Sequence, residues 1–383
     1  LTDLDKPEKI NKNTYFLSDW ITNKNFEKKK IIKKPFKNFK EKAKAYNYIN
    51  KIKPDIENKL AHYIYTYHNK KYSLKLVKSM ISLWVSQYLQ FIYFRWMLID
   101  KLLKKNKKFV INDIKIDPSI NDYLDALDFM DLAFENDIFN FFHLKKIINF
   151  RKSEFKKKIE FKENKKFYKK NFISRNPNNN FKLIIVSFLD KVIDLIVNPL
   201  IRKNKLFLKE GFSYKNLILL NFKFKQLPYF GNFTFNWFSL KKKFKLRREK
   251  IDNILISKNL KKKFEKYLCS NILKDAPTIF FKSLNELENL KKKITLDPKI
   301  IISSHSHFYN ELFKLWSFQR KLENKSKLII FQHGGNHSKL NPVFDYEKTV
   351  SDEFYDWKNN KNKFCGMTKY LNHSIKRNTN KKI

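Results

Sequence analysis

Apolar and polar positions follow different patterns in the two halves of the chain. In the first half the apolar positions recur at helical spacing, and residues 73–105 predict one long helix with Ser73 as its N-cap. Residues 22–60 are rich in Lys and predict partly helical structure, whereas residues 115–150 predict two or three short helices. A β-branched and aromatic run at residues 14–18 predicts a short buried strand.

The second half alternates strands with helices. Residues 277–293 and 310–325 predict helices, and apolar runs predict strands at residues 205–209, 299–304 and 327–331. Because the centre of each strand is an uninterrupted apolar run, we expect these strands in a parallel sheet that is covered on both faces. The sequence therefore predicts an α/β fold: a parallel sheet with a large helical insertion.

The carboxyl ends of two predicted strands carry unusual residues. Ligands of open parallel sheets bind beyond these ends, so the loops after Ser304 and Phe331 mark a candidate site. The chain has only five Gly, and Gly334 and Gly335 follow the second strand almost directly. Adjacent glycines permit backbone conformations that a Cβ blocks, and their amides can hold a phosphate or sugar oxygen. A tight turn is the plainer interpretation.

Four of the eight histidines lie in the same two loops: His305, His307, His333 and His337. An imidazole at the strand exit, where His333 lies, can act as a general base or donate to an anion. The four imidazoles also suit a zinc ion, although no HExxH or CxxC motif accompanies them. An acidic cluster follows within 25 residues, and any member can orient His333 or lie on the solvated surface: Asp345, Glu347, Asp352, Glu353 and Asp356.

Composition narrows the class of function. Lys and Arg number 82 against 37 Asp and Glu, a net charge of +45, but only eight of the basic residues are Arg. Specific nucleic-acid sites favour Arg, so we interpret the excess as solvated Lys and expect no specific nucleic-acid partner. The absence of P-loop, GxGxxG, GxSxG and kinase motifs excludes the commonest NTPases, dehydrogenases and hydrolases.

Cysteine content and hydropathy bear on the compartment. Two Cys give no disulfide framework and favour a reducing environment. The most apolar run, residues 79–94, is shorter than the about 20 residues that span a bilayer, and it contains Gln87 and Gln90. We therefore predict a buried or half-buried helix there, and a cytoplasmic protein with a peripheral contact to an anionic inner membrane.

Two segments resemble a known family. Residues 330–335 read IFQHGG and residues 350–357 read VSDEFYDW. They resemble the Gln-His-Gly-Gly loop and the downstream Ser-Asp segment of a transferase family that is encoded in bacterial O-antigen and surface-polysaccharide clusters. Weaker matches at residues 16–20, 84–96 and 303–316 extend the likeness over most of the chain.

The resemblance implies a domain organisation. The family is similar to GT-B glycosyltransferases, which have two Rossmann-like domains with a cleft between them. By this resemblance, residues 1–357 form the N-terminal, Rossmann-like acceptor-side domain, with the helical insertion at about 60–180. Residues 358–383 are then a linker or the start of a truncated donor-binding domain, and we expect the chain to be a fragment.

The resemblance also implies an activity: glycosyl transfer from a nucleotide-activated sugar in surface-polysaccharide biosynthesis. The expected catalytic residues are His333, Asp352 and Glu347. The expected substrate-binding residues are Gln332, Gly334, Gly335, Ser304, His305 and Asp19. The expected partners are a nucleotide sugar as co-substrate and a saccharide or lipid-linked acceptor, with no permanently bound cofactor and no metal.

Two other classes of function stay open at this point. One is a metal-dependent hydrolase that uses the four-histidine set, His305, His307, His333 and His337. The other is a non-catalytic basic binding protein, which the charge of +45 permits. The family's His before Glu347 is Tyr346 in this chain, so the likeness is incomplete near the candidate site.

Overall fold

A computed structural model describes nine stretches of the chain: residues 35–104, 109–155, 159–168, 200–202, 204–209, 212–227, 235–244, 262–332 and 342–356. Their contacts divide the chain into two compact units. The first unit comprises residues 1–176 and 241–286, and the second comprises residues 177–240 and 287–383. The predicted strand at 14–18 and residues 358–383 lie outside the described residues.

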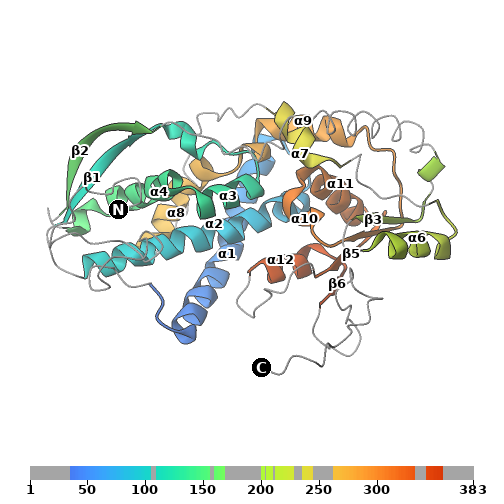
Figure 1. The fold of residues 1–383 in the computed structure, drawn as a ribbon, viewed down its shortest axis with the longest axis horizontal. Helices are drawn as coiled ribbons and strands as arrows, with labels where there is room; N and C mark the ends of the chain where they lie inside the picture. Colours follow the sequence, from blue (N-terminus) through green and yellow to red (C-terminus); the bar gives the residue numbers. More distant parts are fainter. Residues whose placement is uncertain are drawn as a thin grey trace, which may run out of the picture. The chain divides into compact units, whose positions relative to one another are not determined.

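Two long helices form the first unit's framework (Figure 1). They are α1 (Phe39–Tyr67) and α2 (Leu74–Leu103), which pack against each other. α2 begins after Ser73, whose Oγ accepts a hydrogen bond from the Leu76 N–H at 3.2 Å. The predicted long helix and its N-cap are therefore confirmed, and most of its length is buried. Among the described residues, no helix is long and apolar enough to cross a membrane.

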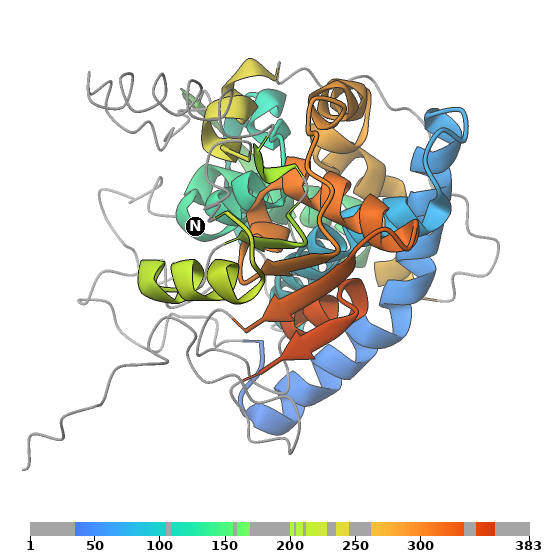
Figure 2. The same cartoon turned by 90° about the vertical axis from the view of Figure 1, so that its right-hand side faces the viewer.

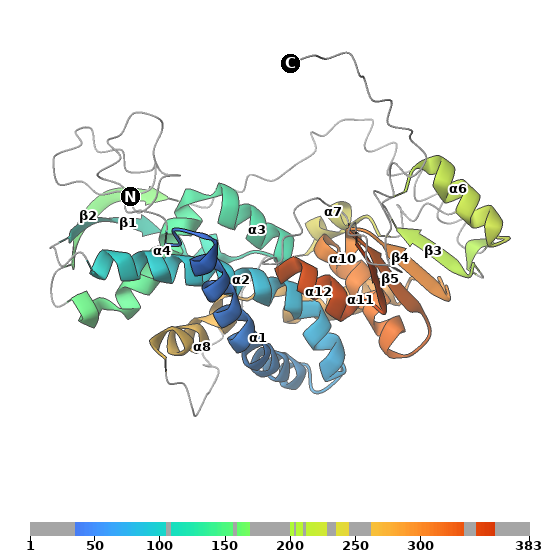
Figure 3. The same ribbon diagram turned by 90° about the horizontal axis from the view of Figure 1, so that it is seen from below.

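The first unit also contains shorter helices and one pair of strands, visible beside α2 in Figure 3. β1 and β2 pair in parallel. The elements are β1 (Phe109–Ile116), η4 (Pro118–Asn121), α3 (Ala126–Glu135), α4 (Asp137–Phe150), η5 (Lys152–Phe155), β2 (Ile159–Tyr168), η6 (Lys241–Lys243), α8 (Lys263–Asp275) and η7 (Thr278–Phe280). The prediction of short helices over 115–150 is confirmed by η4, α3 and α4.

Asp275, at the end of α8, ties several of these elements together inside the first unit. It is fully buried, and it accepts hydrogen bonds from the Tyr88 hydroxyl and the Lys146 ammonium, each at 2.6 Å. Burial alone raises a carboxyl pKa, but Lys146, His143 and the Tyr88 hydrogen bond outweigh it and lower the Asp275 pKa to about 2. The carboxylate is therefore ionised at neutral pH and joins α2, α4 and α8.

The second unit is built on a four-stranded parallel sheet with strand order β3–β4–β5–β6, seen from its side in Figure 2. The strands are β3 (Leu206–Lys209), β4 (Ile300–Ser303), β5 (Lys327–Phe331) and β6 (Glu353–Tyr355). The helices of this unit are α6 (Tyr214–Lys223), α7 (Trp237–Leu240), α10 (Ser306–Tyr309), α11 (Glu311–Leu322) and α12 (Pro342–Val350), and α9 (Lys282–Lys291) ends in it.

Helices cover the two faces of this sheet. On one face Leu217 of α6 packs on Leu206 and Leu208 of β3. On the other face Phe207 contacts Phe313 and Trp316 of α11. The structure is thus α/β, with a Rossmann-like parallel sheet and a large helical part, as the sequence predicts.

One predicted helix is divided. The sequence predicts a single helix over residues 277–293, whereas the structure contains the 3₁₀ turn η7 followed by α9. Phe281 separates them with φ −111° and ψ −125°, which lies outside the helical region. Its side chain is buried and forms an edge contact with Tyr67, so tertiary packing overrides the local preference.

Candidate functional site

The candidate site lies in the second unit, at the carboxyl ends of β4 and β5. Parallel pairing sets Ser303 opposite Ile330, so the segments that follow the two strands start at the same edge of the sheet. Ser304 and His305 follow β4 and lead into α10, and Gln332 follows β5. Five residues of the predicted site or the four-histidine set lie outside the described residues, and their roles stay predictions: Asp19, His333, Gly334, Gly335 and His337.

His307 lies at the centre of the described part of the site. Its side chain is fully buried, and its Nε2 lies 3.1 Å from Oε1 of Glu347, which α12 supplies. Its Nδ1 lies 3.4 Å from the Ser303 hydroxyl at the end of β4. The Tyr346 hydroxyl donates to the His307 carbonyl at 2.7 Å. Two adjacent residues of α12 therefore hold both the side chain and the backbone of His307.

Burial decides the protonation state of Glu347. Its carboxyl group is fully buried, and this desolvation raises its pKa from 4.5 to about 9. Glu347 is then a neutral acid at pH 7 and donates its O–H to Nε2 of His307. With Nε2 accepting, the neutral imidazole carries its proton on Nδ1, which faces the Ser303 hydroxyl.

A second buried ionisable pair lies beside this group. The Lys314 ammonium donates to Oε1 of Glu311 at 2.5 Å within α11, and both side chains are fully buried. The pKa of Tyr346 is raised by its burial and by the nearby Glu311 and Glu347 carboxyl groups. Buried ionisable groups are costly, and they concentrate at functional sites. We call the five fully buried residues the buried cluster: His307, Glu311, Lys314, Tyr346 and Glu347.

Ser304 and His305 lie at the edge of the sheet just before this cluster. The Ser304 hydroxyl is 2.8 Å from Nδ1 of His305. Ser304 is buried, whereas His305 is partly exposed and lies with its ring 5.7 Å from that of Tyr309. A hydroxyl and an imidazole that are hydrogen-bonded at a strand exit can bind a sugar hydroxyl or a phosphate oxygen.

Gln332 and Asp352 occupy opposite ends of the sheet. The Gln332 N–H donates to the Tyr355 carbonyl at 2.8 Å, which places Gln332 at the carboxyl end of β5. Asp352 precedes β6, and its Oδ2 accepts from the Leu328 N–H at 2.8 Å near the amino end of β5. The structure therefore brings Ser304, His305 and Gln332 to one edge and does not bring Asp352 there.

Three members of the buried cluster did not emerge as site residues from the sequence: Glu311, Lys314 and Tyr346. A signal was present for two of them. Glu311 and Lys314 have opposite charges three residues apart at the start of a predicted helix, a spacing that allows an ion pair on one helical face. No sequence pattern reveals that this pair is fully buried.

The described residues form no group of three or more His, Cys, Asp or Glu that is arranged to hold a metal ion. Two members of the four-histidine set, His305 and His307, have hydroxyl or carboxyl partners instead.

Comparison with known proteins places the chain in a family. No match was found among curated proteins, and none among solved structures. The model of a family described as "LIC12162 family transferase" matches residues 1–383, over the whole length of the chain. The chain therefore belongs to the LIC12162 family of transferases.

Proposed function

We propose that this transferase moves a glycosyl group from a nucleotide-activated sugar to a saccharide or lipid-linked acceptor in the biosynthesis of a surface polysaccharide. The buried cluster carries this proposal. Its members His307 and Glu347 lie next to Ser303, at the carboxyl ends of the parallel strands β4 and β5, where a ligand of such a sheet binds. The family description supports transferase chemistry, and the glycosyl specificity is our own step.

Glycosyl transfer sets clear chemical requirements. An acceptor oxygen forms a bond to the anomeric carbon, while the bond from that carbon to a phosphate oxygen breaks and the nucleotide diphosphate leaves. The acceptor hydroxyl must lose its proton to a base, and the leaving phosphate needs hydrogen-bond donors. We assign the first role to His333, and the second to the Gly334 and Gly335 amides.

Sugar and phosphate oxygens need further partners. We assign these contacts to Ser304, His305 and Gln332 at the edge of the sheet, together with Asp19. The pairing of Ser304 with His305 at 2.8 Å fixes the direction of both groups before a ligand arrives. Such preorganisation reduces the entropy that is lost when a ligand is oriented.

Glu347 and His307 act in this proposal as positioning residues. Both side chains are fully buried, and their contact with each other holds the segment that presents Ser304 and His305. In this proposal Asp352 has a structural role, because it accepts a hydrogen bond from the Leu328 N–H at the amino ends of the strands.

The central test is the substitution His333→Ala. With a panel of nucleotide sugars and a lipid-linked saccharide acceptor, this variant should lose at least 100-fold in kcat, because a positioned base contributes about 10²–10⁴-fold. Release of nucleotide diphosphate measures the rate. His62→Ala is the matched control, because His62 is an exposed histidine on α1 in the first unit. Near-normal turnover by His333→Ala would refute the assigned base.

A second test separates positioning from catalysis at Glu347. A glutamine keeps a donor that reaches Nε2 of His307, so Glu347→Gln should retain kcat within about threefold, whereas Glu347→Ala should lower it at least tenfold. Loss of activity in both variants, with normal KM, would instead identify the ionisable carboxyl group as a catalytic base.

The expected contact with an anionic membrane has a candidate element, α6. Leu217 packs this helix on the sheet, whereas Ile218, Leu219 and Phe222 are exposed, with Phe222 64% exposed. Exposed lysines flank these side chains at positions 215, 223 and 225. We propose that this face rests on anionic lipid, because exposed apolar side chains between lysines suit such a surface.

A further inference from the structure

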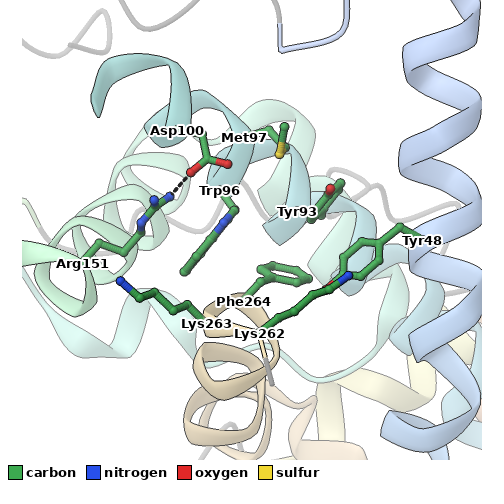
Figure 4. A pocket seen from close by; sticks show the side chains of 9 residues that line it. All are labelled: Tyr48, Tyr93, Trp96, Met97, Asp100, Arg151, Lys262, Lys263 and Phe264. Atoms are coloured by element: carbon green, nitrogen blue, oxygen red, sulfur yellow. Dashed lines mark hydrogen bonds and ion pairs between the residues drawn. The ribbon is translucent and has the colours of Figure 1, made fainter. Parts of the chain in front are cut away.

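A pocket in the first unit is separate from the candidate site and has no role in the proposed chemistry (Figure 4). It has a volume of about 420 Å³, which is within the range of small-molecule sites. α1, α2, the residue after α4, and the start of α8 contribute its walls. The lining residues are Tyr48, Tyr93, Trp96, Met97, Asp100, Arg151, Lys262, Lys263 and Phe264.

Aromatic rings form one continuous wall of this pocket. Phe264 lies with its ring centroid 5.0 Å from Tyr93 and 5.4 Å from Trp96, and Tyr48 lies 5.2 Å from Tyr93. Tyr48 and Tyr93 are only partly buried, so the wall faces the opening as well as the core. Flat aromatic faces bind the C–H face of a sugar ring, which is apolar on one side and polar at its rim.

Polar groups lie beside Trp96, at one end of this wall, in a fixed arrangement (Figure 4). The Arg151 guanidinium stacks on Trp96 at 4.3 Å and donates to Oδ1 of Asp100 at 2.5 Å. Arg151 also donates to both carboxylate oxygens of Glu154, at 3.1 and 2.8 Å, so its plane is held from two sides. A carboxylate beside a guanidinium presents an acceptor and donors with fixed spacing, which suits adjacent sugar hydroxyls.

The rim of the pocket is positively charged. Three of its four charged lining residues are cations, and two of them, Lys262 and Lys263, are adjacent at the start of α8. Lys262 lies 4.3 Å from the Tyr48 ring, and Lys263, whose side chain is 67% exposed, lies 3.6 Å from Oε1 of Glu154. Among the described residues, no side chain makes a capping hydrogen bond at the N-terminus of α8, so its first N–H groups and its helix dipole add to the attraction for an anion.

We propose that this pocket binds an anionic saccharide, a sugar ring that carries a carboxylate or a phosphate group. The ring lies on Tyr48 and Tyr93, the partly exposed rings of the wall, its hydroxyls bind Asp100 and Arg151, and its anionic group binds Lys262 and Lys263. The binding itself does not depend on transfer chemistry. Only the use of this saccharide as the acceptor, or as part of it, rests on the proposed function.

Titration calorimetry of the full chain tests the binding with four probes. They are a tetrasaccharide that contains glucuronate, glucose 1-phosphate, a neutral glucose tetrasaccharide and inorganic phosphate. At least one of the two anionic sugars should bind at least tenfold more tightly than the neutral sugar and than inorganic phosphate. Binding of the glucuronate probe indicates that the ligand is part of an acidic polysaccharide. Binding of glucose 1-phosphate indicates that the ligand is a sugar phosphate.

Two sets of variants locate the binding. Lys262→Ala combined with Lys263→Ala should weaken binding at least tenfold, because it removes both exposed cations. Tyr48→Leu should also weaken binding, because it removes a flat face and keeps an apolar side chain. Lys282→Ala is the matched control, since Lys282 is an exposed first residue of another helix, α9.

Three results would overturn the proposal. The first is that neither anionic sugar binds. The second is that inorganic phosphate or the neutral sugar binds as tightly as the anionic sugars. The third is that the double lysine variant binds like the Lys282→Ala control. Each result concerns equilibrium binding alone, so it is distinct from a failure of the transfer assay.

Discussion

Glu347 shows how a single residue links the fold to the chemistry of the site. A carboxyl group with no access to water stays protonated well above the pH at which an exposed one ionises. Its hydrogen bond to His307 then fixes one tautomer of the imidazole, and this tautomer sets the direction of the proton that faces Ser303. The raised pKa is thus a consequence of the packing of α12.

The Glu347 pKa leads to a prediction for stability. Between its unfolded value and about 9, the folded state retains a proton that the unfolded chain has lost, so the free energy of unfolding falls as pH rises. The Glu347→Gln side chain does not titrate, so the variant lacks this decrease in the free energy of unfolding. Relative to the original chain, the variant should gain on the order of 4 kcal/mol between pH 5 and pH 8, about 1.4 kcal/mol for each pH unit.

Urea unfolding at a series of pH values measures this gain. Asp345→Asn is the control, since Asp345 is an exposed acidic residue on the same helix. If Glu347→Gln instead lowers the free energy of unfolding most at neutral pH, Glu347 and His307 form an ion pair. The assignment of a protonated carboxyl group to Glu347 is then wrong.

At the scale of elements, the accuracy of the sequence predictions follows the strength of the local signals. The strands at 299–304 and 327–331 each contain an uninterrupted apolar run, and both appear in the structure within one residue at each end. β2 lies in a segment rich in charge and was not predicted, because its stability comes from pairing with β1 rather than from its own composition.

The position of the candidate site could be predicted from the sequence, but the burial and the full set of its residues could not. Parallel strands and their carboxyl ends follow from apolar runs, so the position of Ser304 and Gln332 was accessible from the sequence. The displacement of Asp352 to the other end of the sheet was not, because it depends on the start of β6. Only two residues separate that start from the end of α12.

α6 gives a prediction at the same scale. Replacing both Leu219 and Phe222 with Ser should weaken binding to vesicles that contain anionic lipid at least tenfold, because each exposed apolar side chain contributes about 1–2 kcal/mol when it is buried. Cosedimentation with vesicles measures the partition. Phe134→Ser is the control, because Phe134 is 79% exposed on α3. Equal losses in both variants would contradict a specific role for α6.

At the scale of the whole molecule, each of the two units has its own buried polar centre. Asp275 joins α2, α4 and α8 in the first unit, and the buried cluster supports the sheet of the second. The net charge of +45, in contrast, does not reveal this organisation, because it comes mostly from lysines and a net charge carries no information on which groups are buried.

The two centres should be separable by hydrogen exchange. Asp275→Asn weakens the ion pair with Lys146, and we expect a loss of about 3 kcal/mol, or roughly 100-fold faster exchange, in α2, α4 and α8. The amides of β4, β5 and α11 should keep their exchange rates. Lys145→Ala, next to Lys146 on α4, is the control. Faster exchange throughout both units would contradict two independent centres.

The strand order of the second unit has a consequence for synthesis of the chain. β4, β5 and β6 follow one another within about 60 residues, but β3 is separated from its partner β4 by about 90 residues, many of which belong to the first unit. At about 5–20 residues per second, a ribosome exposes β3 for roughly 5–20 s before β4 emerges. During this interval α6, which follows β3 directly in the chain, can pack against Leu206 and Leu208. The helix thus has a second use, as a temporary shield against aggregation of a nascent apolar strand.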